Sequence, residues 1–108
     1  MKTISRDELR AKIDAGADFA LLEVLGPETF AEWHLPGAKN VPADDSFKDK
    51  IGDVVPDKNA EVVVYCKDLA CQASNRALAW MEELGYTNVS DYSEGKLGWK
   101  GAGLPVEQ

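Results

Sequence analysis

The stretch VVVYCKDLACQASNR, residues 62–76, decides the fold that we expect for this chain. It opens with three consecutive valines and a tyrosine, a β-branched and aromatic run that is typical of a buried strand. The run stops at Cys66, a second cysteine follows at Cys71, and a helical pattern starts at Gln72. Both cysteines of the chain are therefore expected at one corner, where a strand meets a helix.

Length and composition bound the class of protein. With 108 residues, 44% hydrophobic and 29% charged, the chain has an ordinary globular composition, and we expect one domain, residues 1–108. The net charge of −7 and the lack of a basic cluster argue against nucleic acid and anionic membranes as partners. No apolar run is long enough to cross a membrane, and the amphipathic N-terminus is unlike a secretory signal. We therefore expect a cytoplasmic location, where both cysteines stay reduced.

The pattern along the chain predicts strands that alternate with helices. Ser5 and Glu8 have the spacing of a capping box, at the start of a helix that Gly16 ends. Strands are expected at 19–25, 38–41, 61–65 and 88–92, and further helices at 27–33, 44–54, 72–84 and 97–100. This alternation is typical of an α/β domain with a mostly parallel sheet, in which ligands bind at the carboxyl ends of the strands. Cys66 lies at such an end.

The corner at Cys66 suits thiol chemistry. A thiol there would face the unpaired N–H groups of a helix N-terminus, which favour negative charge and lower the pKa of a thiol. The same groups could hold the oxygens of a thiosulfonate, phosphate or arsenate. The loop that would supply them consists of Lys67, Asp68, Leu69, Ala70, Cys71 and Gln72. The residues alone leave open a second interpretation, in which Cys66 is a small apolar side chain that ends a buried strand.

The chain gives no sign of a metal site. Two cysteines and the single histidine, His34, offer at most three favoured ligands, and their spacing fits no zinc pattern. The place of His34 before a strand instead predicts a structural hydrogen bond. The tryptophans at 33, 80 and 99 are expected to pack in the core or at its edge.

Three separate segments of the chain resemble the single-domain rhodanese family of sulfurtransferases. They are LLEVLGPETFAEWHLPGAKNVP (21–42), VVVYC (62–66) and ALAWMEELGYTNVSDYSEGKLGW (77–99), the last followed by GLPVE. They occur in the family's order and cover nearly the whole chain. The resemblance implies a three-layer α/β fold, with a central, mostly parallel five-stranded sheet and helices on both faces.

The same resemblance implies a reaction. Cys66 would be the catalytic nucleophile, taking sulfane sulfur from a thiosulfate- or persulfide-type donor and carrying it as a persulfide to a thiol or cyanide acceptor. The loop after Cys66 would hold the anion. The implied partners are a small sulfur donor and a thiol acceptor, either a small molecule or a protein. No metal or organic cofactor is implied, and we expect a monomer or a weak dimer.

The loop departs from the family's usual Cys-x-x-Gly-x-Arg-Ser pattern. Placing Ser74 on the family's serine makes the loop two residues longer, removes the glycine and leaves Ala73 where the arginine would be, with Arg76 further along the helix. The family's Asp-Val-Arg appears here as Glu-Val-Leu, residues 23–25. Less fixed positive charge predicts weaker binding of small dianions. Lys67 either compensates in part or is a solvated surface side chain.

Cys71 keeps alternative functions open. It is either a resolving thiol that forms a disulfide with Cys66 or a small residue that packs at the helix start. Ser74 either lines the loop or simply occupies a position in the first helical turn. The competing functions are a non-catalytic binding or regulatory module and a Cys66–Cys71 thiol-redox protein. An arsenate reductase or phosphatase-like relative is a minor alternative, since no arginine has the Cys-x5-Arg spacing of those phosphatases.

Overall fold

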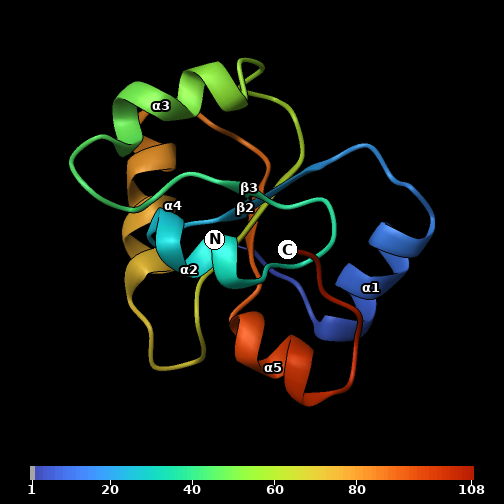
Figure 1. Cartoon of the computed structure of the whole chain (residues 1–108). Helices are drawn as coiled ribbons and strands as arrows, with labels where there is room; N and C mark the ends of the chain where they lie inside the picture. The colour runs from blue at the N-terminus through green and yellow to red at the C-terminus, as the bar shows by residue number, and fades with distance from the viewer. Residues whose placement is uncertain (1) are drawn as a thin grey trace.

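The computed structural model describes residues 2–108 and places a five-stranded sheet between two groups of helices (Figure 1). The strands are β1 (Lys2–Thr3), β2 (Ala20–Glu23), β3 (Lys39–Asn40), β4 (Val62–Tyr65) and β5 (Val89–Asp91). The helices are α1 (Arg6–Asp14), α2 (Pro27–Glu32), α3 (Phe47–Val54), α4 (Ala73–Glu83) and α5 (Gly95–Gly101). The strands lie in the order β1-β5-β4-β2-β3, and every pair is parallel. The predicted α/β class and parallel sheet are confirmed.

Strand β4 is the centre of the sheet and separates two hydrophobic cores. All four of its residues are buried, because helices cover both faces of the sheet. Val62 and Val64 pack with α3 and α4, whereas Val63 and Tyr65 pack with α1 and α5. Figure 1 shows α3 and α4 together on one side and α1 and α5 on the other.

A local signal accounts for the start of α1. The capping box is present, with the Ser5 hydroxyl accepting from the Glu8 N–H and the Glu8 carboxylate accepting from the Ser5 N–H. The chain contains a further strand, β1, for which its two exposed residues give no apolar pattern. The buried stripe of α4 is formed by Ala73, Ala77 and Met81. Trp80 is only partly buried and leans against the ring of Phe47.

The C-terminal tail is held against the turn that follows α2. The backbones of His34 and Glu107 exchange two hydrogen bonds of 2.8 Å, and the Glu107 carboxylate accepts from the Gly37 N–H. The His34 ring stacks on Phe30, and its Nδ1 lies 2.9 Å from the Phe30 carbonyl oxygen. These contacts confirm the structural role predicted for His34.

A buried ion pair joins the end of β2 to α5. The Lys96 Nζ lies 2.9 Å from the Glu23 Oε1, and both side chains are almost fully buried. The ammonium also donates to the carbonyl oxygens of Thr29 and Trp33 at the end of α2, and it lies 4.6 Å from the centre of the Trp33 ring. These carbonyls have no partner within the helix, so a cation is favoured there.

Tyr65 extends this ion pair to the central strand. Its hydroxyl donates to the Glu23 Oε1 at 3.0 Å and accepts from the Leu35 N–H at 3.2 Å. Glu23 and Tyr65 are register partners on neighbouring strands, which brings the hydroxyl to the carboxylate. One buried carboxylate therefore ties together β2, β4, α2 and α5.

The first residues of α5 touch the backbone that follows β4. The Lys96 N–H donates to the Cys66 carbonyl oxygen, and the Leu97 N–H donates to that of Lys67, both at 2.9 Å. Gly95 has φ of 69°, and a Cβ there would lie 2.6 Å from the Lys67 carbonyl and 2.7 Å from the Asp68 nitrogen. Only glycine allows this approach.

We predict that Lys96→Met destabilises the protein by about 3–5 kcal/mol, because it leaves the Glu23 carboxylate buried without a counter-charge. The double variant Glu23→Gln/Lys96→Met is expected to recover most of this loss, since no unpaired charge remains. Urea unfolding of both variants checks this. Equal stability of the single and the double variant would contradict the coupling.

A second prediction concerns the approach at Gly95. Gly16 is a matched control, because it has a similar φ of 64° but no atom within 4 Å of an added Cβ. Gly16→Ala should cost about 1–2 kcal/mol, for the left-handed backbone alone. Gly95→Ala should cost about 1–3 kcal/mol more, because the methyl group also meets the loop backbone. Equal losses of unfolding free energy in the two variants would contradict this prediction, because they would show that the loop backbone moves to accommodate the methyl group.

Candidate active site

Cys66 lies directly after the central strand, at the carboxyl edge of the sheet. Only 2% of its surface is exposed. Its Sγ donates to the Ser74 Oγ at 3.6 Å, and the Ser74 N–H, in the first turn of α4, also points at the sulfur. The helix N-terminus therefore faces the thiol as the sequence predicts, and Ser74 lines the site.

The pKa of Cys66 differs from the prediction. Burial is the largest influence and raises the pKa of this thiol, and a hydrogen bond with Cys71 raises it further. The hydroxyl and the N–H of Ser74 lower the pKa, but by less. The prediction of a lowered pKa was wrong, because the sequence could not show how completely the sulfur is removed from water.

Cys71 is the more acidic of the two thiols. Burial is the largest influence on the pKa of Cys71 and raises it, and the nearby Asp68 carboxylate raises it further. Hydrogen bonds from the Cys66 thiol and from the backbone of Lys67 and Ala73 to the sulfur outweigh both and lower that pKa below the usual value. The side chain is partly exposed. The loop thus brings both sulfurs within hydrogen-bonding distance and lowers the pKa of the more accessible one.

Several backbone donors of the loop are already engaged within it. The Cys71 N–H donates to the Asp68 carbonyl oxygen at 3.2 Å, and the Ala70 N–H donates to the Asp68 carboxylate at 3.0 Å. The Lys67 backbone forms a hydrogen bond with the Cys71 sulfur. Of the six loop residues proposed to hold an anion, these three therefore bind the loop's own atoms.

Four of the six loop side chains are exposed to solvent. Lys67, Ala70 and Gln72 are exposed, and Leu69 is 75% exposed. Arg76 is exposed on α4. Lys67 therefore fits the interpretation of a solvated surface side chain.

Two groups at the site were missed by the sequence interpretation. Lys96 is a buried cation one residue beyond Gly95, and Asp91 is a buried carboxylate at the end of β5. The sequence held one signal for Lys96. A glutamate inside the apolar strand β2 is expected to be buried, and a buried carboxylate requires a cationic partner somewhere in the chain. Asp91 gave no such signal, since an aspartate next to a turn is ordinary in sequence.

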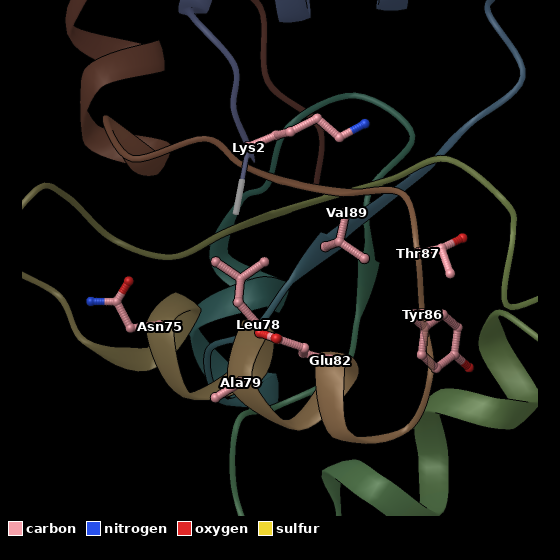
Figure 2. A pocket seen from close by; sticks show the side chains of 8 residues that line it. All are labelled: Lys2, Asn75, Leu78, Ala79, Glu82, Tyr86, Thr87 and Val89. Carbon is pink, nitrogen blue, oxygen red and sulfur yellow. The ribbon is translucent and has the colours of Figure 1, made fainter.

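A separate groove of about 340 Å³ lies between α4 and the β5 edge (Figure 2). Its walls include Leu78 and Glu82 from α4, Val89 from β5 and Lys2 from β1. It shares no residue with the loop and contains neither cysteine.

Two further features of the described chain bear on the site. Residues 2–108 do not gather three or more His, Cys, Asp or Glu side chains into a group that could hold a metal ion. Within the same residues, no helix combines the length and apolar character that crossing a membrane requires.

Comparison with known sequences yields two informative relatives. The thiosulfate sulfurtransferase PspE of Escherichia coli (strain K12) is 39% identical over 70 residues, which are 65% of this chain and 64% of PspE. The HTH-type transcriptional regulator Rv0324 of Mycobacterium tuberculosis is 30% identical over 105 residues, which are 97% of this chain and 44% of the regulator. The chain therefore spans less than two thirds of either relative.

Solved structures agree on the fold. The solution NMR structure of the rhodanese-like domain from the Anabaena protein Alr3790 matches with a TM-score of 0.85 and 23% identity, over 99% of this chain and 79% of that one. The rhodanese-like domain family itself matches residues 5–102, nearly the whole chain. The resemblance drawn from the sequence is confirmed, and the chain belongs to the rhodanese-like domain family.

Proposed function

We propose that this protein is a sulfurtransferase that carries sulfane sulfur as a persulfide on Cys66. The observation that carries the proposal is the position of this thiol at the carboxyl end of the central strand, with the Ser74 N–H and hydroxyl directed at its sulfur. Groups placed there can stabilise a sulfur anion as it forms. Similarity to a thiosulfate sulfurtransferase supports the same reaction class.

The reaction has two steps. The Cys66 thiolate attacks the outer sulfur of the donor; with thiosulfate, the S–S bond breaks, sulfite leaves and Cys66 holds a persulfide anion. An acceptor thiolate or cyanide then attacks the outer sulfur of the persulfide, and the Cys66 thiolate is restored. Charge and sulfur balance in each step, and no oxidant is consumed. This is covalent catalysis by a ping-pong route.

The loop favours a persulfide donor over thiosulfate. Arg76 is exposed on α4, and the loop donors at Ala70 and Cys71 bind Asp68, so little fixed positive charge is available for a dianion. Leu69 and Leu97 are the two large exposed apolar side chains of residues 2–108, at 75% and 44% exposure. Leu69 belongs to the loop, and the Leu97 backbone is bonded to it. Apolar surface at a reactive thiol supports a protein as the acceptor.

The contact between the two sulfurs favours a second candidate, a thiol-redox protein. The Cys71 thiolate would attack the inner sulfur of a protonated Cys66 persulfide, forming a Cys66–Cys71 disulfide and releasing hydrosulfide. The sulfane sulfur is reduced in this step and the two cysteines are oxidised. A dithiol reductant would then restore both thiols.

Intact mass after incubation with thiosulfate or with glutathione persulfide tests both candidates. We expect a gain of one sulfur, about 32 Da, in the wild type and in Cys71→Ser, and none in Cys66→Ser. If Cys71 resolves the persulfide, the wild type should instead lose about 2 Da, while Cys71→Ser keeps the added sulfur.

The outcomes separate the functional classes. A gain that survives in Cys66→Ser would place the sulfur elsewhere and overturn the assignment of Cys66. No mass change with either donor, in any variant, would overturn sulfur transfer and leave a non-catalytic binding module. Alkylation of the unfolded protein controls for the number of free thiols.

A further inference from the structure

Asp91 is a buried carboxylate close to the candidate active site, and residues 2–108 supply it with no counter-charge. It ends β5, beside Val64 on the strand that delivers Cys66, and only 6% of its surface is exposed. Its Oδ2 accepts from the Ser93 hydroxyl at 3.1 Å. Its Oδ1 is buried and has no hydrogen-bond partner among the described residues. An unpaired buried oxygen destabilises the fold, so its presence in this structure calls for an explanation.

Ser74 lies between this carboxylate and the Cys66 thiol. Its hydroxyl accepts from the Cys66 Sγ at 3.6 Å and is itself almost fully buried. The same hydroxyl is near enough to Asp91 to lower the pKa of that carboxyl, although burial has the larger effect and raises the pKa overall. A hydroxyl has one proton to donate and two lone pairs, so it can accept from the thiol while it donates to the carboxylate.

We propose that Asp91 is a positioning residue that, through the Ser74 hydroxyl, takes the proton of Cys66 when its sulfur becomes a nucleophile. The S–H bond of Cys66 breaks as its proton moves to the Ser74 Oγ, and the Ser74 proton moves to the Asp91 carboxylate. Cys66 becomes a thiolate, Asp91 becomes a neutral acid and Ser74 is unchanged. The charge of the group stays at −1, and no other reactant is needed.

This arrangement resolves the conflict between burial and reactivity at Cys66. Burial opposes a second negative charge in the same pocket, so a thiolate beside an ionised carboxylate is disfavoured. Moving the proton between the two groups creates the thiolate without adding a charge. The two groups then titrate as a pair, as interacting buried acids do.

The charged groups on the surrounding elements are engaged elsewhere. On β1, Lys2 donates to the Asn88 side chain at 2.6 Å, and on α1, Arg6 pairs with Glu94 at 3.0 Å. On α4, Arg76 is exposed. The influences on the pKa of Asp91 are burial, Ser93 and Ser74, and no charged group within residues 2–108 contributes. Cys71 is the other titratable group in contact with Cys66.

The test measures how the rate of Cys66 alkylation by iodoacetamide depends on pH, with intact mass as the readout. All variants carry Cys71→Ser, because Cys71 could otherwise accept the proton of Cys66. With Asp91 present, we expect a rate that is nearly constant between about pH 6 and pH 8, because thiol and carboxylate share one proton. With Asp91→Asn, the rate should fall about tenfold for each pH unit below the pKa of the thiol. Asparagine keeps the shape and removes an unpaired buried charge, so the fold should be retained.

Variants of the two serines complete the test. Ser74→Ala should reproduce the steep profile of Asp91→Asn, and Ser74→Thr should restore the flat one, because only the hydroxyl is needed. Ser93→Ala is the matched control, since it removes the other hydrogen bond of Asp91 and should leave the profile flat. A steep profile with Asp91 present, or a flat one in Asp91→Asn, would overturn the proposal. The proposal rests on the proposed function, but the assay uses no sulfur donor, so its failure is distinguishable from a failure of sulfur transfer.

Discussion

The ion pair between Glu23 and Lys96 is the interaction on which the site's geometry depends. Each charge would be strongly unfavourable in the core by itself. Together they are tolerated because the Tyr65 hydroxyl donates to the Glu23 Oε1 and two backbone carbonyls accept from Lys96, although the Glu23 Oε2 has no hydrogen-bond partner within residues 2–108. The pair fixes the start of α5 against the end of β2. From that position, the backbone of α5 holds Cys66 and Lys67 in place. The thiol is therefore positioned by an ion pair that it does not touch.

The same pair explains a departure from the family pattern. The family's aspartate is a glutamate here, and the arginine two residues later is a leucine. The longer side chain of Glu23 reaches a cation that α5 supplies, so the charge balance at the end of β2 is kept by a residue distant in sequence. The cost is that this cation is buried beneath the site and is not available to a bound anion.

The loop differs from a simple anion-binding loop, because many of its hydrogen-bond donors already have partners within the protein. Its backbone donors form hydrogen bonds with Asp68 and with the Cys71 sulfur, and the buried carboxylate of Asp91 lies near Ser74. Two thiols and one carboxylate compete for few donors in a space with little water. In such a space the number of negative charges, more than the acidity of any single group, decides which sulfur is ionised.

The sequence by itself determined the fold class, the family and the place of Cys66. Alternating apolar runs, the capping box and Gly16 act over a few residues, and the structure confirms the elements that they predict. Strand β1 and the buried stripe of α4 were decided only by tertiary packing, because two exposed residues carry no pattern and several faces of α4 are apolar. The raised pKa of Cys66, the partner of Glu23 and the meeting of Ser74 with Asp91 were likewise beyond the sequence. Burial and charge contacts join residues tens of positions apart, and only the folded chain brings them together.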